Sequence, residues 1–302
     1  MSETPVIQNI PKKYRVVFFG TPEFALPVLE SLFRSKVFEL VGVVTQPDRP
    51  SGRKLHLTPT AVRSKAKELG LDTLAPPSIN KPEGREWLAA HKADLGIVVA
   101  FGQILSQKVL DLFPYGCFNI HASLLPRWRG AAPIQRAIEA GDSITGVCLQ
   151  KMVKELDAGD LIGQREISIP ADMNSLTLHD TLAPLGAHIL EKELVDFLSG
   201  ERTAKPQDPL LVTIARKIEK SESLITWDQP ATQIANKIRA FAWGPGCYTY
   251  FRKTLLKLHQ AQVNSDALWD RSDGRKNTEP NLESTSAEHN RNEKPVAGQV
   301  ES

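Results

Sequence analysis

The pair Asn119 and His121 is the part of this sequence best suited to chemistry. Both residues stand at the end of a short apolar run within residues 117–136. In a β-strand, residues i and i+2 face the same side, so the two side chains project together. An amide donor beside an imidazole supplies an oxyanion stabiliser and a proton-transfer group at one place, as acyl-type transfer requires. A buried structural histidine is the alternative interpretation of His121.

Asp157 could complete this pair, and its local sequence allows two interpretations. It lies in residues 155–160, Glu-Leu-Asp-Ala-Gly-Asp. Asp and Gly favour turns, so a plain turn explains the composition. Alternatively, the carboxylate lies beside His121 and orients the imidazole or a bound water. The local sequence does not separate these interpretations.

Two basic segments could contact phosphate groups. One spans residues 46–58, and the other surrounds Trp128, whose ring offers a stacking surface. A solvated polar loop explains the first segment equally well, whereas the functional interpretation is a flexible cationic arm along a phosphate backbone. The predicted nucleic-acid contacts are Arg49, Arg53, Lys54, Arg127 and Arg129.

Alternating strands and helices must position these residues. Continuous apolar runs, typical of buried parallel strands, occupy residues 15–20, 40–45, 95–101 and 118–121. Helical patterns lie between them, one of them over residues 104–113. This alternation predicts an α/β fold with a doubly wound, mostly parallel sheet, whose sites lie outside the carboxyl ends of the strands. The first strand is not followed by a GxGxxG pattern, which argues against NAD or FAD.

The second half of the sequence predicts a domain boundary. Residues 176–198 form a long amphipathic pattern, in which Pro184 predicts a kink or a break. We predict a catalytic domain over residues 14–200, a polar linker over 201–208 and a second domain over 209–302. Residues 264–302 have the composition of a disordered polar tail.

Composition excludes several classes of protein. The formal net charge is only +2, but residues 264–302 hold five Lys/Arg and eight Asp/Glu, so the rest of the chain carries +5. A local basic surface is therefore compatible with the total, and a strongly basic protein is not. The three cysteines are far apart, which argues against a disulfide framework or zinc site and fits a reducing cytosol. No apolar run reaches membrane-spanning length.

Four stretches resemble one protein family. They are residues 17–24, 46–54, 119–135 (NIHASLLPRWRGAAPIQ) and 156–160 (LDAGD). Together they are similar to the formyltransferases that use 10-formyltetrahydrofolate, and the similarity covers about residues 14–263. The RWRGAAPI form, the basic segment and the second domain are most similar to members that act on initiator methionyl-tRNA.

This resemblance implies a fold and a reaction. The fold would be a Rossmann-like catalytic domain followed by a smaller OB-type β-barrel, apparently truncated because the chain ends where the family's barrel continues. The reaction would transfer a formyl group from 10-formyltetrahydrofolate to the free α-amino group of methionyl initiator tRNA, in translation initiation. By matching motif, Asn119, His121 and Asp157 take the catalytic roles. The implied folate contacts are Phe101, Gly102, Ile104, Leu105, Ser123, Leu124, Leu125 and Pro126.

The resemblance also implies partners and leaves two alternatives. We expect a monomer without a metal, located in a bacterial or organellar cytoplasm and not bound to a membrane. Ala122 departs from the family pattern, because many members have Gly there. One alternative is the same chemistry on a sugar nucleotide or another small amine. The other is a truncated, inactive homologue that binds tRNA.

Overall fold

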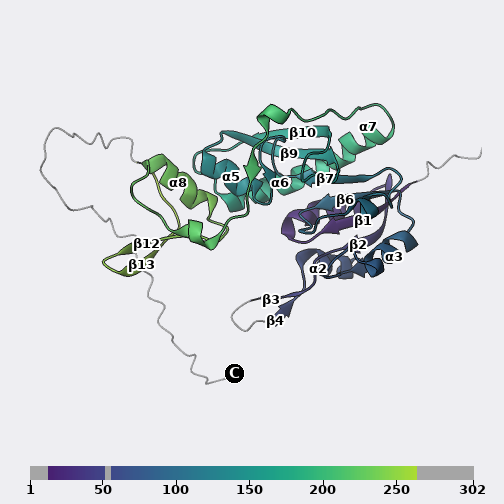
Figure 1. The fold of residues 1–302 in the computed structure, drawn as a ribbon, viewed down its shortest axis with the longest axis horizontal. Helices are drawn as coiled ribbons and strands as arrows, with labels where there is room; N and C mark the ends of the chain where they lie inside the picture. Colours follow the sequence, from purple (N-terminus) through teal and green to yellow (C-terminus); the bar gives the residue numbers. More distant parts are fainter. Residues whose placement is uncertain (1–12, 52–55, 264–302) are drawn as a thin grey trace, which may run out of the picture. The chain divides into compact units, whose positions relative to one another are not determined.

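A mostly parallel sheet organises the protein (Figure 1). The computed structural model describes residues 13–51 and 56–263. The sheet has seven strands in the order β10-β9-β7-β6-β1-β2-β5. They are β1 (Tyr14–Gly20), β2 (Phe38–Val44), β5 (Thr73–Leu74), β6 (Leu95–Val99), β7 (Cys117–His121), β9 (Ile144–Lys151) and β10 (Leu161–Ser168). Neighbouring strands from β7 to β5 are parallel, whereas β9 is antiparallel to both β7 and β10, which confirms the predicted fold class.

Helices α1 to α5 lie between strands of the sheet, and α6 to α8 follow its last strand, β10. They are α1 (Leu26–Arg34), α2 (Ala61–Glu68), α3 (Pro82–Ala90), α4 (Gln107–Leu110), α5 (Pro133–Ala140), α6 (Ser175–Ile189), α7 (Val195–Leu198) and α8 (Ala231–Ala240). A short 3₁₀ turn, Glu23–Ala25, precedes α1. Helix α5 ends at Gly141, whose φ of 77° is the left-handed conformation that glycine adopts most easily. Helix α4 is shorter than the predicted residues 104–113.

Both faces of the sheet are covered, and strand β1 shows why. Val16 and Phe18 face a core that includes residues of α1 and α6, whereas Val17 and Phe19 face a second core with α3 and α4. Alternating side chains of one strand thus enter two apolar layers, as the period of two dictates. A strand buried on both faces reads as a continuous apolar run, which is why the sequence predicted it.

The long helical pattern after β10 is not broken at Pro184. That residue lies inside α6, and the helix continues to Ile189. A π-helical turn, Leu190–Leu194, follows and leads into α7. Of the predicted kink or break at Pro184, the break does not occur, because Leu182 and Ala183 are buried in the core and the packing holds the helix together despite one missing hydrogen bond. A kink at this residue stays a prediction.

The basic segment after β2 begins and ends as an antiparallel ribbon. Strand β3 (Arg49–Ser51) pairs with β4 (His56–Thr58), and Figure 1 shows this ribbon projecting from the region after β2. Residues 52–55 between the two strands, which include the predicted contacts Arg53 and Lys54, lie outside the described residues.

After residue 200 the chain bridges to β10, where Lys205 pairs with Leu161, before it forms its last elements. These are the 3₁₀ turns Pro209–Leu211 (η3) and Lys220–Ser223 (η4), with β11 (Ile214–Ala215), α8, β12 (Cys247–Phe251) and β13 (Thr254–Leu258). Strand β11 pairs in parallel with β8 (Arg129–Gly130). Strands β12 and β13 form an antiparallel pair in the region predicted as an OB-type barrel. The predicted polar tail, residues 264–302, lies outside the described residues.

The hydrophobic core continues across the predicted linker. Ile234 and Ile238 of α8 belong to the same core as Ile138 of α5 and Leu182 of α6. The described residues up to Val263 accordingly form one compact unit. The division of the chain into two domains at residues 201–208 stays a prediction.

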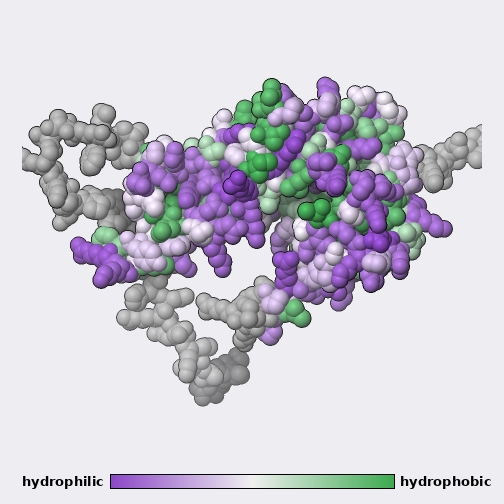
Figure 2. Space-filling view, viewed as in Figure 1, coloured by the Kyte–Doolittle hydropathy of each residue, from purple (hydrophilic) through white to green (hydrophobic). Residues whose placement is uncertain are grey.

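Most of the surface visible in Figure 2 is hydrophilic, with an exposed apolar area over residues 209–214. Leu210 is 90% exposed and Leu211 62% exposed. Within the described parts of the chain, none of the helices combines the length and hydrophobicity that crossing a membrane requires.

An ion pair fastens the C-terminal segment to α5. The Arg136 guanidinium donates through Nη1 and Nη2 to the two carboxylate oxygens of Glu222, at 2.8 and 3.0 Å. It also donates to the backbone carbonyl oxygens of Arg216 and Lys217. Hydrogen bonding to Arg136 lowers the pKa of the Glu222 carboxyl group.

The Glu222→Gln variant should be less stable than the parent protein only above acidic pH. Because the pKa of Glu222 is lower in the folded state, its contribution is present above the ordinary Glu pKa and is lost as the pH falls through the folded pKa. Glu222 is 31% exposed, so solvent screens the pair and we expect a loss of about 1 kcal/mol, or about 2 °C in Tm, at pH 7.

Thermal unfolding between pH 3 and pH 8 checks this, with the exposed Glu166→Gln as the control. A difference in Tm that persists undiminished at the acidic end would contradict an ionic origin.

Candidate active site

Asn119 and His121 occupy the carboxyl end of β7, as predicted. The strand is central, paired with β6 on one side and β9 on the other. Its apolar neighbours Phe118 and Ile120 are buried in the core, so the two polar side chains point away from that layer. Asn119 is 9% exposed and His121 7% exposed. Such buried polar groups require partners, and the partners define the site.

The loop between β9 and β10 brings Asp157 to this pair. Its Oδ1 accepts a hydrogen bond from Asn119 Nδ2 at 3.3 Å, and its Oδ2 accepts one from the Gly130 N–H at 2.8 Å. The Asp157 side chain is 11% exposed, and its backbone has a φ of 49°, which is uncommon for a residue other than glycine. The second interpretation of Asp157 is therefore the one the geometry favours, because a surface turn would leave the carboxylate in solvent.

The hydrogen bonds of His121 fix which ring nitrogen carries a proton. Its Nε2 lies 2.8 Å from the carbonyl oxygen of Trp128. A carbonyl oxygen can only accept, so Nε2 carries hydrogen and the neutral imidazole keeps its lone pair on Nδ1. That Nδ1 lies 3.7 Å from Asp157 Oδ2. The ring atom that can take up a proton thus faces a carboxylate.

Gln150 belongs to this cluster and was missed in the sequence. It lies opposite Asn119 in the pairing of β7 with β9 and is 1% exposed. Its Nε2 donates to Asp157 Oδ1 at 3.2 Å, and its Oε1 accepts from the Gly159 N–H at 3.1 Å. An isolated polar residue at the end of an apolar strand was the available signal. Gly159 is required here, since a Cβ would lie 1.7 Å from the Lys151 carbonyl oxygen.

Arg127, a predicted nucleic-acid contact, already has a partner within the protein. Its Nε and Nη2 donate to the two oxygens of Asp142 at 2.9 and 2.7 Å, which raises the pKa of Arg127. It also lies 4.4 Å from the centre of the Trp128 ring, whose Nε1 donates to the same carboxylate. This set holds the loop that supplies the carbonyl partner of His121.

Arg129 and Arg49 are placed differently. Arg129 donates through Nε and Nη2 to Gln207 Oε1, at 3.0 and 2.7 Å. Arg49 is exposed on β3 and donates to Gln46 Oε1 at 3.2 Å. Of the described basic residues predicted to bind tRNA, Arg49 is the one on a projecting element. A phosphate contact by any of them stays a prediction.

The predicted folate contacts follow two adjacent strands. The first group follows β6 and the second follows β7, so both lie at the carboxyl edge of the sheet. Ile104 is 72% exposed, Gly102 is exposed, and Leu124 and Pro126 are partly exposed. The buried members are Phe101, Leu105, Ser123 and Leu125.

The turn after β6 is fixed by groups from two other strand ends. The Phe101 carbonyl oxygen accepts from Thr21 Oγ1 at 2.8 Å and from Gln46 Nε2 at 3.2 Å. Thr21 follows β1 and Gln46 follows β2, so the ends of three parallel strands are tied together at the edge where Asn119 and His121 stand.

The buried thiols of β7 and β9 and the hydroxyl of Ser123 are poor nucleophiles, and of the two thiols only that of Cys148 lies at the end of β7 where His121 stands. Cys148 is the strand partner of His121, and burial raises the pKa of its thiol to about 12. Burial also raises the pKa of the Cys117 thiol well above its usual range. Ser123 is fully buried, and its hydroxyl donates to the Arg127 carbonyl oxygen at 2.7 Å. The arrangement favours direct transfer between two bound substrates over a covalent enzyme intermediate.

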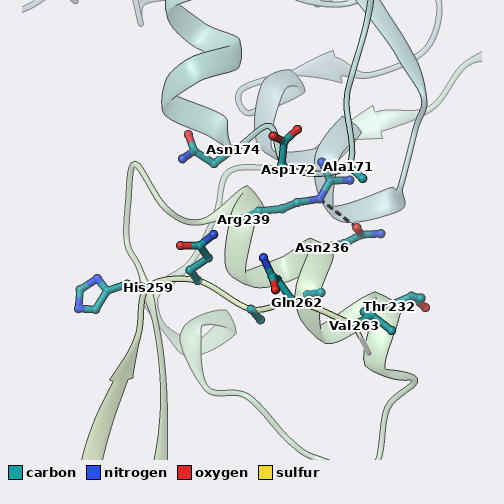
Figure 3. A pocket seen from close by; sticks show the side chains of 12 residues that line it. Ala171, Asp172, Asn174, Thr232, Asn236, Arg239, His259, Gln262 and Val263 are labelled. Carbon is teal, nitrogen blue, oxygen red and sulfur yellow. Dashed lines mark hydrogen bonds between the residues drawn. The ribbon is translucent and has the colours of Figure 1, made fainter. Parts of the chain in front are cut away.

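A separate cavity of about 600 Å³ lies away from these residues (Figure 3). It is bordered by the loop before α6, by α8 and by residues 259–263. Arg239 points into it and donates to Asn236 Oδ1 and to the Met173 carbonyl oxygen, both at 3.0 Å. None of the three predicted catalytic residues borders this cavity.

Comparison with known proteins identifies the family of the chain. Residues 13–194 match the family described as formyl transferase, and residues 217–279 match the formyl transferase C-terminal domain. The methionyl-tRNA formyltransferase of Bdellovibrio bacteriovorus is 55% identical over 84% of this chain and 80% of its own length. That of Methylococcus capsulatus is 48% identical over 82% of this chain and 80% of its own length.

A solved structure shares the fold. The N-formyltransferase of Helicobacter canadensis, described in complex with folinic acid and dTDP-3-aminofucose, gives a TM-score of 0.62 at 16% identity. The likeness covers 82% of this chain and 87% of that one. With its parallel sheet, its clustered polar site and these relatives, the chain belongs to the formyl transferase family, among relatives named methionyl-tRNA formyltransferase.

Proposed function

We propose that the protein transfers a formyl group from 10-formyltetrahydrofolate to the α-amino group of methionyl initiator tRNA. The observation that carries this proposal is the cluster of Asn119, His121 and Asp157 in a chain that is 55% identical to a methionyl-tRNA formyltransferase. The folate is supported by the family and by the folinic acid named for the Helicobacter canadensis structure. The reaction forms a bond from the amine nitrogen to the formyl carbon and breaks the bond from that carbon to the folate nitrogen.

His121 is the proton carrier in this proposal. Free α-amines have a pKa of about 8, and only the neutral form attacks. As that neutral amine bonds to the formyl carbon its nitrogen becomes positively charged, so it must lose a proton to give the amide. The lone pair on His121 Nδ1 accepts that proton, while Nε2 stays bonded to the Trp128 carbonyl oxygen. The imidazolium then delivers a proton to the departing folate nitrogen, which balances the transfer.

Asn119 stabilises the negative oxygen of the tetrahedral intermediate. Its Nδ2 has two hydrogens, and the bond to Asp157 Oδ1 occupies one of them. The other is available to the oxyanion, and such a donor typically contributes about 3 kcal/mol in the transition state. Asp157 therefore also orients the oxyanion donor, because the bond it accepts sets the plane of the Asn119 amide.

Asp157 stabilises the imidazolium by charge. Its Oδ2 lies 3.7 Å from His121 Nδ1 and is held by the Gly130 N–H, while Gln150 holds Oδ1. A carboxylate fixed on both oxygens cannot turn away when the proton arrives on Nδ1. The charged and polar groups of the site thus do not have to reorient during the reaction. Such preorganisation is the main source of electrostatic catalysis.

We assign the two substrates to different parts of the chain. Folate is placed along residues 101–105 and 123–126, which follow β6 and β7. The tRNA is placed on the ribbon β3–β4 and on the part of the chain after residue 209. The proposed enzyme is a monomer that acts in a bacterial or organellar cytoplasm, and the relatives compared are bacterial.

A direct assay tests the function. The purified chain is incubated with 10-formyltetrahydrofolate and either methionyl initiator tRNA or methionine amide. We expect formylated tRNA and little formylated amide, because a small amine lacks the contacts of the tRNA body. Transfer to a small amine alone would assign the chain to another acceptor, and transfer to neither would refute the proposed chemistry.

His121→Ala should lower kcat by about a hundredfold or more, the usual scale for a general acid–base group. Folding and the KM of both substrates should change little. His91→Ala is a matched control, because the His91 ring also contacts a carbonyl oxygen and a carboxylate, but away from the site. If kcat stays near that of the parent enzyme, His121 is not the proton carrier.

Asp157→Asn should lower kcat strongly while the protein stays folded, since the amide keeps the shape and removes the charge opposite Nδ1. Single-turnover formylation measures the chemical step alone, with Asp72→Asn beside His91 as the control. An Asp157→Asn protein as fast as the parent would mean that this residue only shapes its turn.

Neutralising the basic ribbon should weaken the use of tRNA without affecting folate. Combined replacement of Arg49, Arg53 and Lys54 by alanine should raise the KM for tRNA and flatten its salt dependence by up to about one unit of slope per lost contact. Lys36→Ala is the control, because Lys36 precedes β2 at the opposite edge of the sheet. An unchanged salt slope would leave residues 46–58 as a solvated ribbon.

A further inference from the structure

One glutamine in the predicted linker reaches both loops that form the catalytic cluster. Gln207 belongs to the predicted linker, residues 201–208, and lies outside the helices and strands. Its Nε2 donates to the carbonyl oxygens of Asp157 and Gly159, at 2.9 and 2.7 Å. Its Oε1 accepts both hydrogen bonds from the Arg129 guanidinium, at 3.0 and 2.7 Å. A single amide thus joins the loop after β9 to the loop after β7.

The amide orientation follows from its partners. Carbonyl oxygens only accept and guanidinium groups only donate, so the reversed amide would meet repulsion on both sides. Both amide hydrogens and the amide oxygen of Gln207 are therefore used on these loops. A surface linker would need none of these bonds.

These bonds act on the two groups that hold the Asp157 carboxylate. The loop between β9 and β10 carries Asp157 itself, in its uncommon backbone conformation, and Gly159, whose N–H donates to Gln150. The other carries Gly130, whose N–H donates to Asp157 Oδ2. Movement of one loop relative to the other would change the distance from Asp157 Oδ2 to His121 Nδ1, which is 3.7 Å.

The same segment also fixes the carbonyl partner of His121. The Trp128 N–H donates to Thr213 Oγ1, and the Arg129 N–H donates to the Thr213 carbonyl oxygen, both at 2.9 Å. Residues 207–215 therefore hold the backbone on both sides of the peptide group whose oxygen accepts from His121 Nε2.

We propose that Gln207 is a positioning residue for formyl transfer, which it supports by fixing the Asp157 carboxylate opposite His121. This inference rests on the proposed function. Gln207 touches neither reacting group; it acts through the backbone of Asp157 and through Arg129. Its loss should therefore lower kcat and leave the KM of both substrates nearly unchanged.

Two substitutions separate the two sides of the amide. Gln207→Leu removes every bond. Gln207→Glu keeps an acceptor for Arg129, but it loses both N–H donors and places a charge against two carbonyl oxygens. We expect both variants to lower kcat by about ten- to a hundredfold, because a misplacement of about 1 Å costs on that scale. Asp208→Ala is the matched control, since that side chain only caps its own turn.

A second readout does not depend on activity. The N–H groups of Gly130 and Gly159 report the two braced bonds, and their hydrogen exchange by NMR should be faster in both variants than in the parent. Amides of the central strand β6 should exchange at the parental rate, which separates local loosening from global unfolding.

The outcomes are distinct. A Gln207→Glu enzyme with parental kcat would overturn the inference, because the bond to Arg129 alone would then suffice. Parental kcat and parental exchange in Gln207→Leu would overturn it as well. If Gln207→Leu does not fold, Gln207→Glu decides. An inactive parent chain would refute the proposed function, and the exchange measurement would still decide whether Gln207 braces the loops.

Discussion

A carboxylate that is only 11% exposed must be supplied with hydrogen-bond donors, and the arrangement around Asp157 follows from that need. Its three donors come from three different strands: Asn119 from β7, Gly130 from β8 and Gln150 from β9. Each is held by backbone pairing, so the negative charge is fixed in place. His121 then has a proton-accepting nitrogen beside that charge, and Asn119 has its amide plane set by the same carboxylate. One hydrogen-bonded carboxylate therefore orients both side chains of the proposed catalytic pair.

The sheet makes this convergence possible. Parallel strands end at one edge, so residues following β1, β2, β6 and β7 meet there although they are far apart in the chain. The antiparallel strand β9 runs back beside β7, which places Gln150 opposite Asn119 and starts the loop that carries Asp157. Apolar layers on both faces hold β7 rigidly. The buried thiol of Cys148, whose pKa is raised, lies opposite His121 without adding a competing nucleophile.

The C-terminal part of the chain stabilises the site as well as extending the fold. Segment 207–215 pairs with β8 and holds the backbone beside His121, while Arg136 and Glu222 join α5 to the following turn. Helix α8 shares its core with α5 and α6. Matches to the formyl transferase family continue through residues 217–279, so this region belongs to the same enzyme architecture. The segment predicted as a linker is hydrogen-bonded, through Gln207, to the loops that follow β7 and β9.

The sequence alone determined the sheet class and the pairing of Asn119 with His121, because continuous apolar runs and a period of two are local properties. The motifs at 119–135 and 156–160 also identified the family. Tertiary structure decided the rest. The sequence left open whether Asp157 is a turn residue or a partner of His121, and the path of the β9–β10 loop places it beside Asn119. Pro184 lies within α6 because core packing outweighs the local tendency of proline to end a helix. The sequence marked Gln150 only as an isolated polar residue in an apolar strand, and it gave no sign of the contacts of Gln207 or of the protein partners of Arg127 and Arg129. Long-range hydrogen bonds depend on which loops meet in space.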